Sequence, residues 1–321
     1  MKKVKKIVWL IIFVTLVFFM FKSWWNSQLS PVSADKSSKI VVIEKGESFS
    51  AISAKLKEDH LIKNTQAFNI YGKQSGLENK IQAGTFRVSP SMTGREILKI
   101  LTTEPLDNWV TLLEGWRMEE VADKLNQVLG IDKKDFLKVA KEGYMFPDTY
   151  LFPKDYSATQ IAQKLENTFD MKYSANLRSR IKSLGLTEGQ GVILASIVER
   201  EARSSEVRKM VASILLKRLK IGMGLNVDAS IQYALGYQRQ EKSWWKKDLS
   251  LDDLKIDSPY NTYIHSGLPP TPICNPSVSS LQALADADPS TPYLYYYHDS
   301  KGNSYYAKTL EEHNTNVANN P

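Results

Sequence analysis

Residues 194–203 read LASIVEREAR, and the spacing of their side chains on a helix decides how this chain is read. At about 100° per residue, Leu194 and Ile197 lie on one apolar stripe. Glu201 follows Ile197 by four residues and therefore lies in that stripe, whereas Glu199 falls on the opposite face. A carboxylate that faces a core must be paired or protonated, because burial penalises its charge. Burial also raises the pKa of a carboxyl group, so Glu201 is the candidate general acid.

The pattern leaves a structural role open for the same residue. Glu201 could lie at a frayed helix end or pair with Arg200, Arg203 or Arg208, because structural ion pairs also perturb pKa values. Glu199 is expected to point away from any cleft at Glu201, so a Glu199→Gln change is expected to cost little.

The chain opens with MKKVKKIVWLIIFVTLVFFMFKSWW, in which four lysines precede an uncharged apolar run over residues 7–21. We expect residues 1–25 to form a cytoplasmic tip and a single-pass anchor in the plasma membrane, with the rest of the chain outside. The alternative is a cleaved signal peptide, for which residues 32–34 offer only a distant cleavage site. Residues 26–38 are polar and serine-rich, which is typical of a linker.

Composition excludes several classes of function. Five of the 42 basic residues and no acids lie in residues 1–22, which leaves 37 basic and 35 acidic residues in the remainder. Most of the net charge of +7 therefore comes from the N-terminal lysines, which set the orientation in the membrane. The nearly neutral remainder predicts no nucleic-acid partner. The one cysteine, Cys274, cannot form an internal disulfide bond. Four scattered histidines predict no metal site, and nothing indicates a cofactor.

The hydrophobic patterns predict an α+β protein with three parts after the linker. Residues 39–105 form a small module whose elements follow the order strand, helix, helix, strand, helix: residues 40–43, a helix capped by Ser48, residues 66–73, residues 85–88 and a helix begun by Thr93. The first four elements, with a G-x-S turn at 46–48, resemble a LysM peptidoglycan-binding module.

Residues 106–157 are expected to form a second small α+β subdomain, with a strand at 109–113 and an amphipathic helix behind it. The segment YMFPDTYLFP at 144–153 has two prolines and four aromatic residues, which indicate a rigid, exposed platform. Residues 158–321 form a mainly helical domain. In it, a long loop at 258–276 contains five prolines and is expected to be functional, and a closing hairpin is expected at 292–307.

Seven segments occur in a fixed order along the chain: AGTFRV at 83–88, EGW at 114–116, YMFPDTYLFP at 144–153, the Glu201 helix, GMGLNVD at 222–228, PYNTY at 259–263 and SGLPPTPICNP at 266–276. With HNTNV at 313–317, they resemble the endolytic murein transglycosylase (MltG/YceG-like) family over almost the whole chain. In that family the second Glu of the E-x-E pair is catalytic, which corresponds to Glu201.

The resemblance implies a membrane-anchored lytic transglycosylase with a lytic-transglycosylase-like catalytic domain. It would cleave the MurNAc-GlcNAc β-1,4 bonds within nascent peptidoglycan strands and so limit their length. Glu201 would first protonate the leaving oxygen and then, as a base, deprotonate the C6 hydroxyl of the substrate. That hydroxyl attacks C1 and gives a 1,6-anhydroMurNAc end, with the advantage of an intramolecular reaction.

Five further residues are expected to bind the glycan. Asn226 and Asp228 would line the cleft, unless they only form a capped turn after Gly224. Asn261 would bind an N-acetyl group or hold Glu201, with Tyr260 and Tyr263 as platforms for sugars, unless these three only pack the loop.

Two other functions remain open from the sequence. The chain could be a peptidoglycan-binding scaffold without catalytic activity, or a muramidase that hydrolyses the same bond with Asp228 as a second carboxylate. The expected partners are peptidoglycan strands and the plasma membrane, and peptidoglycan synthases are candidate partners.

Overall fold

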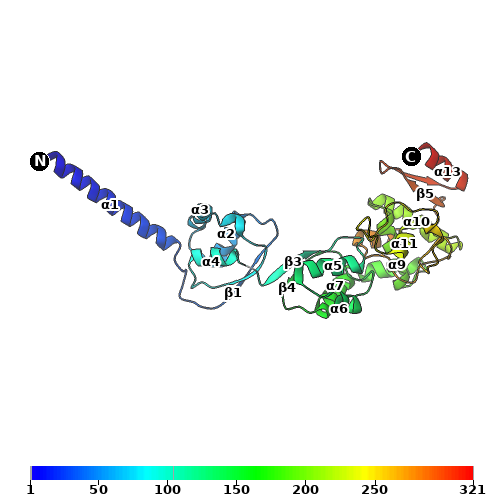
Figure 1. Ribbon diagram of the computed structural model, residues 1–321, viewed down its shortest axis with the longest axis horizontal. Helices are drawn as coiled ribbons and strands as arrows, with labels where there is room; N and C mark the ends of the chain where they lie inside the picture. Colours follow the sequence, from blue (N-terminus) through cyan, green and yellow to red (C-terminus); the bar gives the residue numbers. More distant parts are fainter. Residues whose placement is uncertain (1, 104, 321) are drawn as a thin grey trace. The chain divides into compact units, whose positions relative to one another are not determined.

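The computed structural model describes the backbone of residues 2–103 and 105–320, and side chains from Trp9 onward except at positions 10, 11 and 104 (Figure 1). The chain divides into two compact units. The first contains Met1–Trp109 with Leu151–Asp155, and the second contains Val110–Tyr150 with Tyr156–Pro321.

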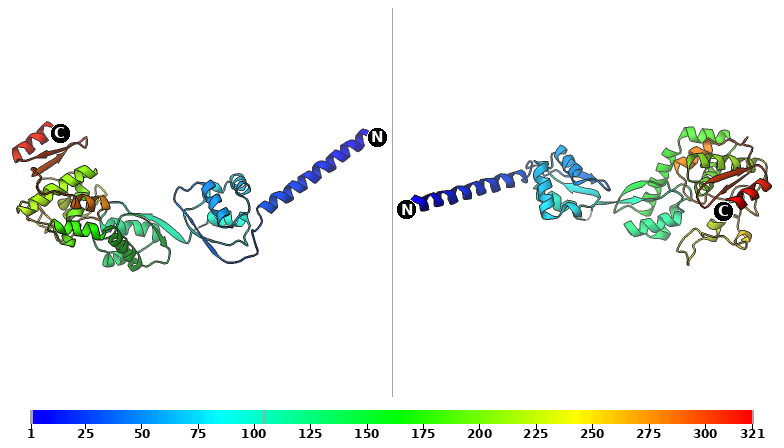
Figure 2. Two further views of the ribbon diagram at one scale, coloured as in Figure 1. Left: turned by 180° about the vertical axis from the view of Figure 1, so that it is seen from behind. Right: turned by 90° about the horizontal axis from the view of Figure 1, so that it is seen from above.

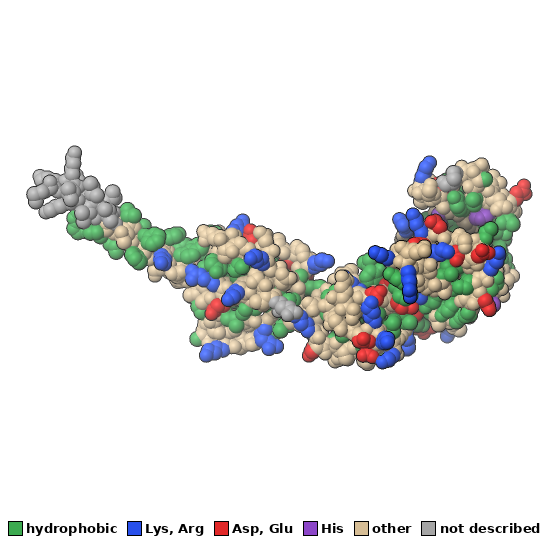
Figure 3. Space-filling view, viewed as in Figure 1, with side chains coloured by type: hydrophobic (Ala, Val, Ile, Leu, Met, Phe, Trp, Pro, Cys, Tyr) green, Lys and Arg blue, Asp and Glu red, His purple; other side chains and the backbone are tan. Residues whose placement is uncertain are grey.

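Helix α1 (Lys2–Gln28) begins the first unit. Its described side chains between Ile12 and Phe21 are exposed, and Figure 3 shows hydrophobic side chains along this helix. No helix in the described part of the chain combines the length and the mean hydropathy that crossing a bilayer requires. The predicted anchor, residues 1–25, includes positions 1–8, 10 and 11, whose side chains lie outside the described residues.

The predicted linker is in part packed against the first unit. Leu29 is buried, and its carbonyl oxygen accepts a hydrogen bond of 2.8 Å from the Gly94 amide. The amides of Val32 and Ser33 both donate to the Pro90 carbonyl. The start of residues 26–38 is therefore ordered by apolar burial and backbone hydrogen bonds.

The remaining elements of this unit follow the predicted order: β1 (Lys39–Ile43), α2 (Phe49–Glu58), α3 (Thr65–Ser75), the short 3₁₀ helix η1 (Glu78–Lys80), β2 (Gly84–Val88) and α4 (Gly94–Leu101). The strands β1 and β2 pair antiparallel, from Lys39 opposite Val88 to Ile43 opposite Gly84. Ser48 caps α2, and Thr93 begins α4 with a capping box to Glu96, as the sequence predicts. The order of elements is confirmed, while the likeness to LysM stays a prediction.

The second unit is mainly helical (Figure 2). The strands β3 (Asp107–Thr111) and β4 (Thr149–Pro153) pair with each other, and each contributes residues to both units. The other elements are α5 (Met118–Leu129), α6 (Lys133–Val139), α7 (Ala158–Lys172), α8 (Ala175–Ser183), α9 (Glu188–Glu201), α10 (Ser205–Lys220), α11 (Asp228–Leu235), the 3₁₀ helix η2 (Asp253–Lys255), α12 (Val278–Ala285), β5 (Tyr295–His298), β6 (Ser304–Ala307) and α13 (Leu310–Asn319). The predicted closing hairpin is confirmed as the antiparallel pair β5–β6, against which α13 packs.

The expected exposed platform at 144–153 is wrong. Phe146, Tyr150 and Phe152 are buried, and the Tyr150 hydroxyl donates to the Phe146 carbonyl at 2.8 Å. Aromatic side chains of this size gain more free energy in a core than at a surface. The segment is therefore structural.

Helix α9 lies at the centre of the second unit. It packs against α8, α10, α11 and α12, and residues from Val192 to Val198, except the partly buried Ile193, are fully buried. A helix that is covered on several sides leaves few positions for polar groups, so the two carboxylates near its C-terminal end need explicit partners.

Candidate active site

Glu201 is the last residue of α9, and its carboxyl group lies in a partly buried position against the β5–β6 hairpin. The Tyr296 hydroxyl donates to Glu201 Oε2 at 2.9 Å. The pKa of Glu201 is raised to about 7: burial is the largest cause and the nearby Asp228 adds to it, whereas hydrogen bonds from Tyr296 and the Ala229 backbone lower the pKa. The expected upward shift of this pKa is confirmed.

The three arginines that could have neutralised Glu201 are not paired with it in the described chain. Arg208 forms an ion pair of 2.6 Å with Glu199. The Arg200 guanidinium lies 3.7 Å from the centre of the Trp245 ring. Arg203 is exposed and lines a cavity next to Glu201. The carboxyl group of Glu201 is thus held by hydrogen bonds from Tyr296 and the Ala229 backbone rather than by an arginine, and Glu201 lines the same cavity as Arg203.

Glu199 has a structural role that the sequence did not predict. Its side chain is 3% exposed, and Arg208, with which it pairs, is 9% exposed. Glu199 Oε2 also accepts hydrogen bonds from the Ser277 amide, the Ser277 hydroxyl and the Ser280 hydroxyl. Glu199 lines neither cavity at Glu201, as expected, and a small effect of Glu199→Gln on turnover stays a prediction. The cost of this change is instead expected in stability, because this face of α9 is covered by α10 and the start of α12.

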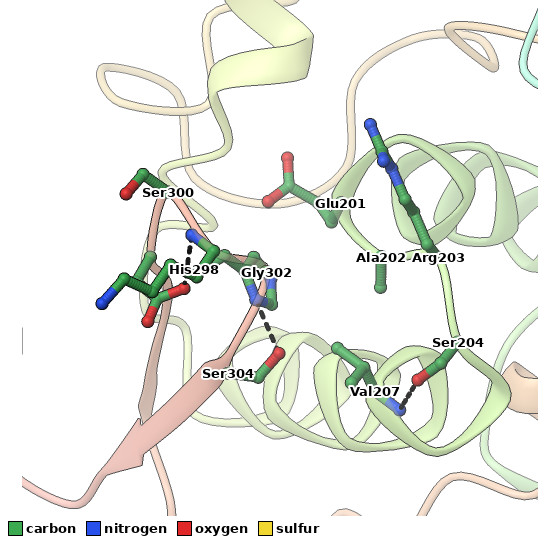
Figure 4. A pocket seen from close by; sticks show the side chains of 11 residues that line it. Glu201, Ala202, Arg203, Ser204, Val207, His298, Ser300, Gly302 and Ser304 are labelled. Carbon is green, nitrogen blue, oxygen red and sulfur yellow. Dashed lines mark hydrogen bonds between the residues drawn. The ribbon is translucent and has the colours of Figure 1, made fainter. Parts of the chain in front are cut away.

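Two cavities meet at Glu201. The first, which we call the Arg203 cavity, has a volume of about 460 Å³ and lies between the turn after α9 and the turn of the hairpin. Figure 4 shows Glu201 and Arg203 on one wall and His298 and Ser304 on the other. The second, which we call the Asp228 cavity, has a volume of about 450 Å³ and is lined by residues that include Asp228, Tyr296 and His313. Volumes of this size are typical of ligand sites.

The structure brings three of the predicted binding residues to the Asp228 cavity. Asp228 begins α11, and its Oδ1 accepts a hydrogen bond of 2.6 Å from the Tyr263 hydroxyl. Asn226 lines the same cavity with a left-handed backbone (φ 51°), a conformation that asparagine tolerates better than most residues. Asn226, Asp228 and Tyr263 therefore share one wall with Glu201.

The structure does not bring Asn261 and Tyr260 to either cavity. Asn261 is fully buried, its amide nitrogen donates to the carbonyls of Leu254 and Ile256, and its oxygen accepts from the Tyr263 amide. The Tyr260 ring packs against Tyr233, with ring centres 4.8 Å apart. In this structure the loop uses the polar and apolar surface of both residues itself, and the binding role predicted for them stays a prediction.

The sequence missed the contribution of the hairpin and of Arg218. Tyr296 and His298 stand two apart on β5, so they share one face of the strand and both line the Asp228 cavity. Burial lowers the pKa of His298, whose Nδ1 lies 2.9 Å from the Ser304 hydroxyl.

Arg218 is buried and donates to the carbonyls of Leu225 and Leu294, which ties the turn before Asp228 to the hairpin. The sequence predicted the hairpin at 292–307 but not that it lies against Glu201.

The chemistry that this arrangement offers is proton transfer by a single carboxyl group at a place where two cavities meet. A carboxyl with a pKa of about 7 is present in both protonation states near neutral pH, so it can act as an acid and then as a base. In residues 2–103 and 105–320 the structure contains no cluster of three His, Cys, Asp or Glu side chains that could hold a metal ion.

Comparison with known proteins identifies the family of the chain. The model of the YceG-like family matches residues 41–319. The endolytic murein transglycosylase of Bacillus subtilis (strain 168) is 30% identical over 90% of this chain and 87% of its own length. The endolytic murein transglycosylase of Streptococcus pneumoniae serotype 2 is 28% identical over 90% of this chain, which spans 60% of that relative. The crystal structure of a YceG-like protein from Listeria monocytogenes matches with a TM-score of 0.61 and 30% identity, covering 87% of this chain and 99% of that protein. The chain therefore belongs to the YceG-like family.

Proposed function

We propose that this protein is an endolytic murein transglycosylase, a lyase that cuts MurNAc-GlcNAc β-1,4 bonds within peptidoglycan strands. The observation that carries the proposal is the position of Glu201, whose carboxyl group has a pKa of about 7 and borders both cavities. The name of the Bacillus subtilis relative, which this chain matches over 87% of that relative's length, supports the same activity.

In the proposed reaction, protonated Glu201 donates its proton to the glycosidic oxygen as the C1–O bond breaks. The resulting carboxylate then removes the proton from the C6 hydroxyl, whose oxygen attacks C1 and closes the 1,6-anhydro ring. The proton lost in the first step is regained in the second, so no water is consumed. Tyr296 donates to Glu201 Oε2 at 2.9 Å and so holds the carboxyl group in place.

The two cavities support an internal cut. An enzyme that cuts within a strand must accommodate sugars on both sides of the broken bond. Glu201 and His298 line both cavities, so a strand could pass from the Arg203 cavity to the Asp228 cavity with the bond at Glu201. In the Asp228 cavity, Asn226, Asp228 and Tyr263 would bind the sugar.

The anchor also remains part of the proposal. The lysines before the apolar run and the exposed hydrophobic side chains between Ile12 and Phe21 support a single-pass helix over residues 1–25, with the N-terminus in the cytoplasm. The enzyme would then act outside the plasma membrane, near peptidoglycan synthases. We retain 39–105 as a LysM-like module, 106–157 as a second subdomain and 158–321 as the catalytic domain.

A muramidase is the second candidate, because Asp228 places another carboxylate in the cavity next to Glu201. A scaffold that only binds peptidoglycan is the third. Analysis of the products separates all three, since a lyase gives anhydro ends, a muramidase gives reducing ends and a scaffold gives no cleavage.

The experiment that tests Glu201 is the Glu201→Gln variant. It keeps the size of the side chain but cannot transfer a proton, so turnover should fall by about two to three orders of magnitude while glycan binding survives. Glu206→Gln is the matched control, because Glu206 is an exposed carboxylate on the next helix and lines neither cavity. Near-normal turnover of Glu201→Gln would refute the assignment.

A further inference from the structure

The Arg203 cavity contains two cations that have no partner in the described protein. Arg203 and Lys301 are exposed and line the cavity from opposite walls, one after α9 and the other in the hairpin turn. Neither side chain forms an ion pair or a hydrogen bond within residues 9–103 and 105–320. Unpartnered cations on both sides of a cavity favour an anionic ligand.

The acidic groups of the same cavity cancel only part of this charge when Glu201 is protonated. Asp299 Oδ1 accepts from the amides of Lys301 and Asn303, and its Oδ2 accepts from the Asn303 side chain and the Tyr305 hydroxyl. Asp299 therefore holds the hairpin turn and keeps one negative charge, because the hydrogen bond from the Asn303 side chain lowers its pKa. Arg203 and Lys301 carry two positive charges, so the balance in the cavity stays positive while Glu201 is protonated. The other acidic residue is Glu201, which must carry a proton when the substrate is cut.

We infer that the Arg203 cavity is a subsite for a carboxylate on the O3 substituent of the MurNAc residue nearest the cut, bound by Arg203 and Lys301. This inference rests on the proposed function. Every MurNAc residue carries an O3-lactyl group, which ends in a free carboxylate when the peptide stem is absent and leads to the carboxylates of the stem when it is present. Both sources share the chemistry that two cations recognise.

The volume of the cavity agrees with this assignment. About 460 Å³ is within the range that binds small organic ligands, and it exceeds what one water or a small ion requires. The cavity also borders Glu201 directly, so a substituent on the sugar at the cut would reach it without crossing another element. Charge and position together make the subsite select strands that carry the acidic substituent.

The test measures binding with the Glu201→Gln protein, which holds strands without cutting them. Three purified glycan strands are compared: strands with peptide stems, stem-free strands with the lactyl carboxylate, and stem-free strands in which that carboxylate is converted to a neutral methylamide. We expect a lower Kd for at least one carboxylate-bearing strand than for the neutral strand, by about fivefold or more at low salt. Whether the stem or the lactyl group supplies the carboxylate follows from which of the first two binds more tightly.

The Arg203→Gln/Lys301→Gln double variant, in the same background, should lose this preference. Lys308→Gln is the matched control, because Lys308 is an exposed lysine near the hairpin that lines neither cavity, and it should retain the preference. An Arg203→Lys variant that keeps the charge should retain most of it. Equal Kd values for all three strands, or a preference that survives the double variant, would overturn the inference. Failure of the unmutated protein to cut any strand would instead refute the proposed function.

Discussion

Replacing Tyr296 with Phe removes one oxygen atom from the site and leaves the ring in place. The lost atom donates to Glu201 Oε2 at 2.9 Å, and the ring packs against the core of the second unit. The change therefore isolates the hydrogen bond from the packing. Tyr296 contacts Glu201, the proposed acid, but the proposed reaction does not require Tyr296 itself to transfer a proton.

The size of the effect follows from the charge of the acceptor. A hydrogen bond to an ionised group contributes about 1.5–3 kcal/mol, and one pKa unit corresponds to about 1.4 kcal/mol. Because the protonated carboxyl can also bond to the hydroxyl, only part of this energy distinguishes the two states. We therefore expect the loss of the bond to raise the pKa of Glu201 by ~1 unit above its value of about 7.

The assay is the pH dependence of kcat/KM for cleavage of a stem-free strand. Glu201 must be protonated in the free enzyme, so kcat/KM falls as the pH rises through its pKa. In Tyr296→Phe that alkaline limb should move to higher pH by ~1 unit. A structural defect alone would lower kcat/KM at every pH without moving the limb.

Tyr306→Phe provides the control, because Tyr306 pairs with Tyr296 across the hairpin but lines neither cavity. Its profile should match that of the unmutated enzyme. The reasoning is refuted if the limb stays in place in a Tyr296→Phe protein that melts at the normal temperature.

Three further predictions follow from the structure. Glu199→Gln should lower the free energy of unfolding by about 3–5 kcal/mol, measured by urea denaturation, because it leaves the buried Arg208 unpaired; a loss under 1 kcal/mol would contradict the buried pair. Reporters fused to the N-terminus and to residue 321 should lie in the cytoplasm and outside, respectively, whereas a mature protein that begins near Asp35 would indicate a cleaved signal. A fragment that starts near Leu106 should still give anhydro ends but release strands with a broader distribution of lengths, and an unchanged distribution would show that residues 39–105 do not set strand length.

Local signals explain why much of the fold could be predicted. Ser48 and Thr93 begin their helices as cap residues, and the hairpin β5–β6 lies in the aromatic-rich segment where the sequence predicts it. Glu201 was found in the same way, from helical spacing alone. These features depend on residues within a few positions of one another, which a single sequence displays.

The remaining features depend on partners far along the chain. The structural role of Glu199 was missed because helical spacing does not distinguish a solvent-exposed face from one covered by Ser277 and Ser280. Tyr296 was missed because it meets Glu201 across 95 residues. Asn261 carries an amide that suits either a sugar or a loop backbone, and its partners Leu254 and Ile256 in the folded loop are visible only in the structure.

The most direct test of the account is the analysis of products formed in water labelled with heavy oxygen. The account holds that Glu201 directs an attack by the C6 hydroxyl of the substrate, so the new ends should be 1,6-anhydroMurNAc and should contain no label. Mass spectrometry of the released fragments measures both properties at once. New reducing ends that carry one labelled oxygen would contradict the account, because they would show that water and not the sugar attacks C1.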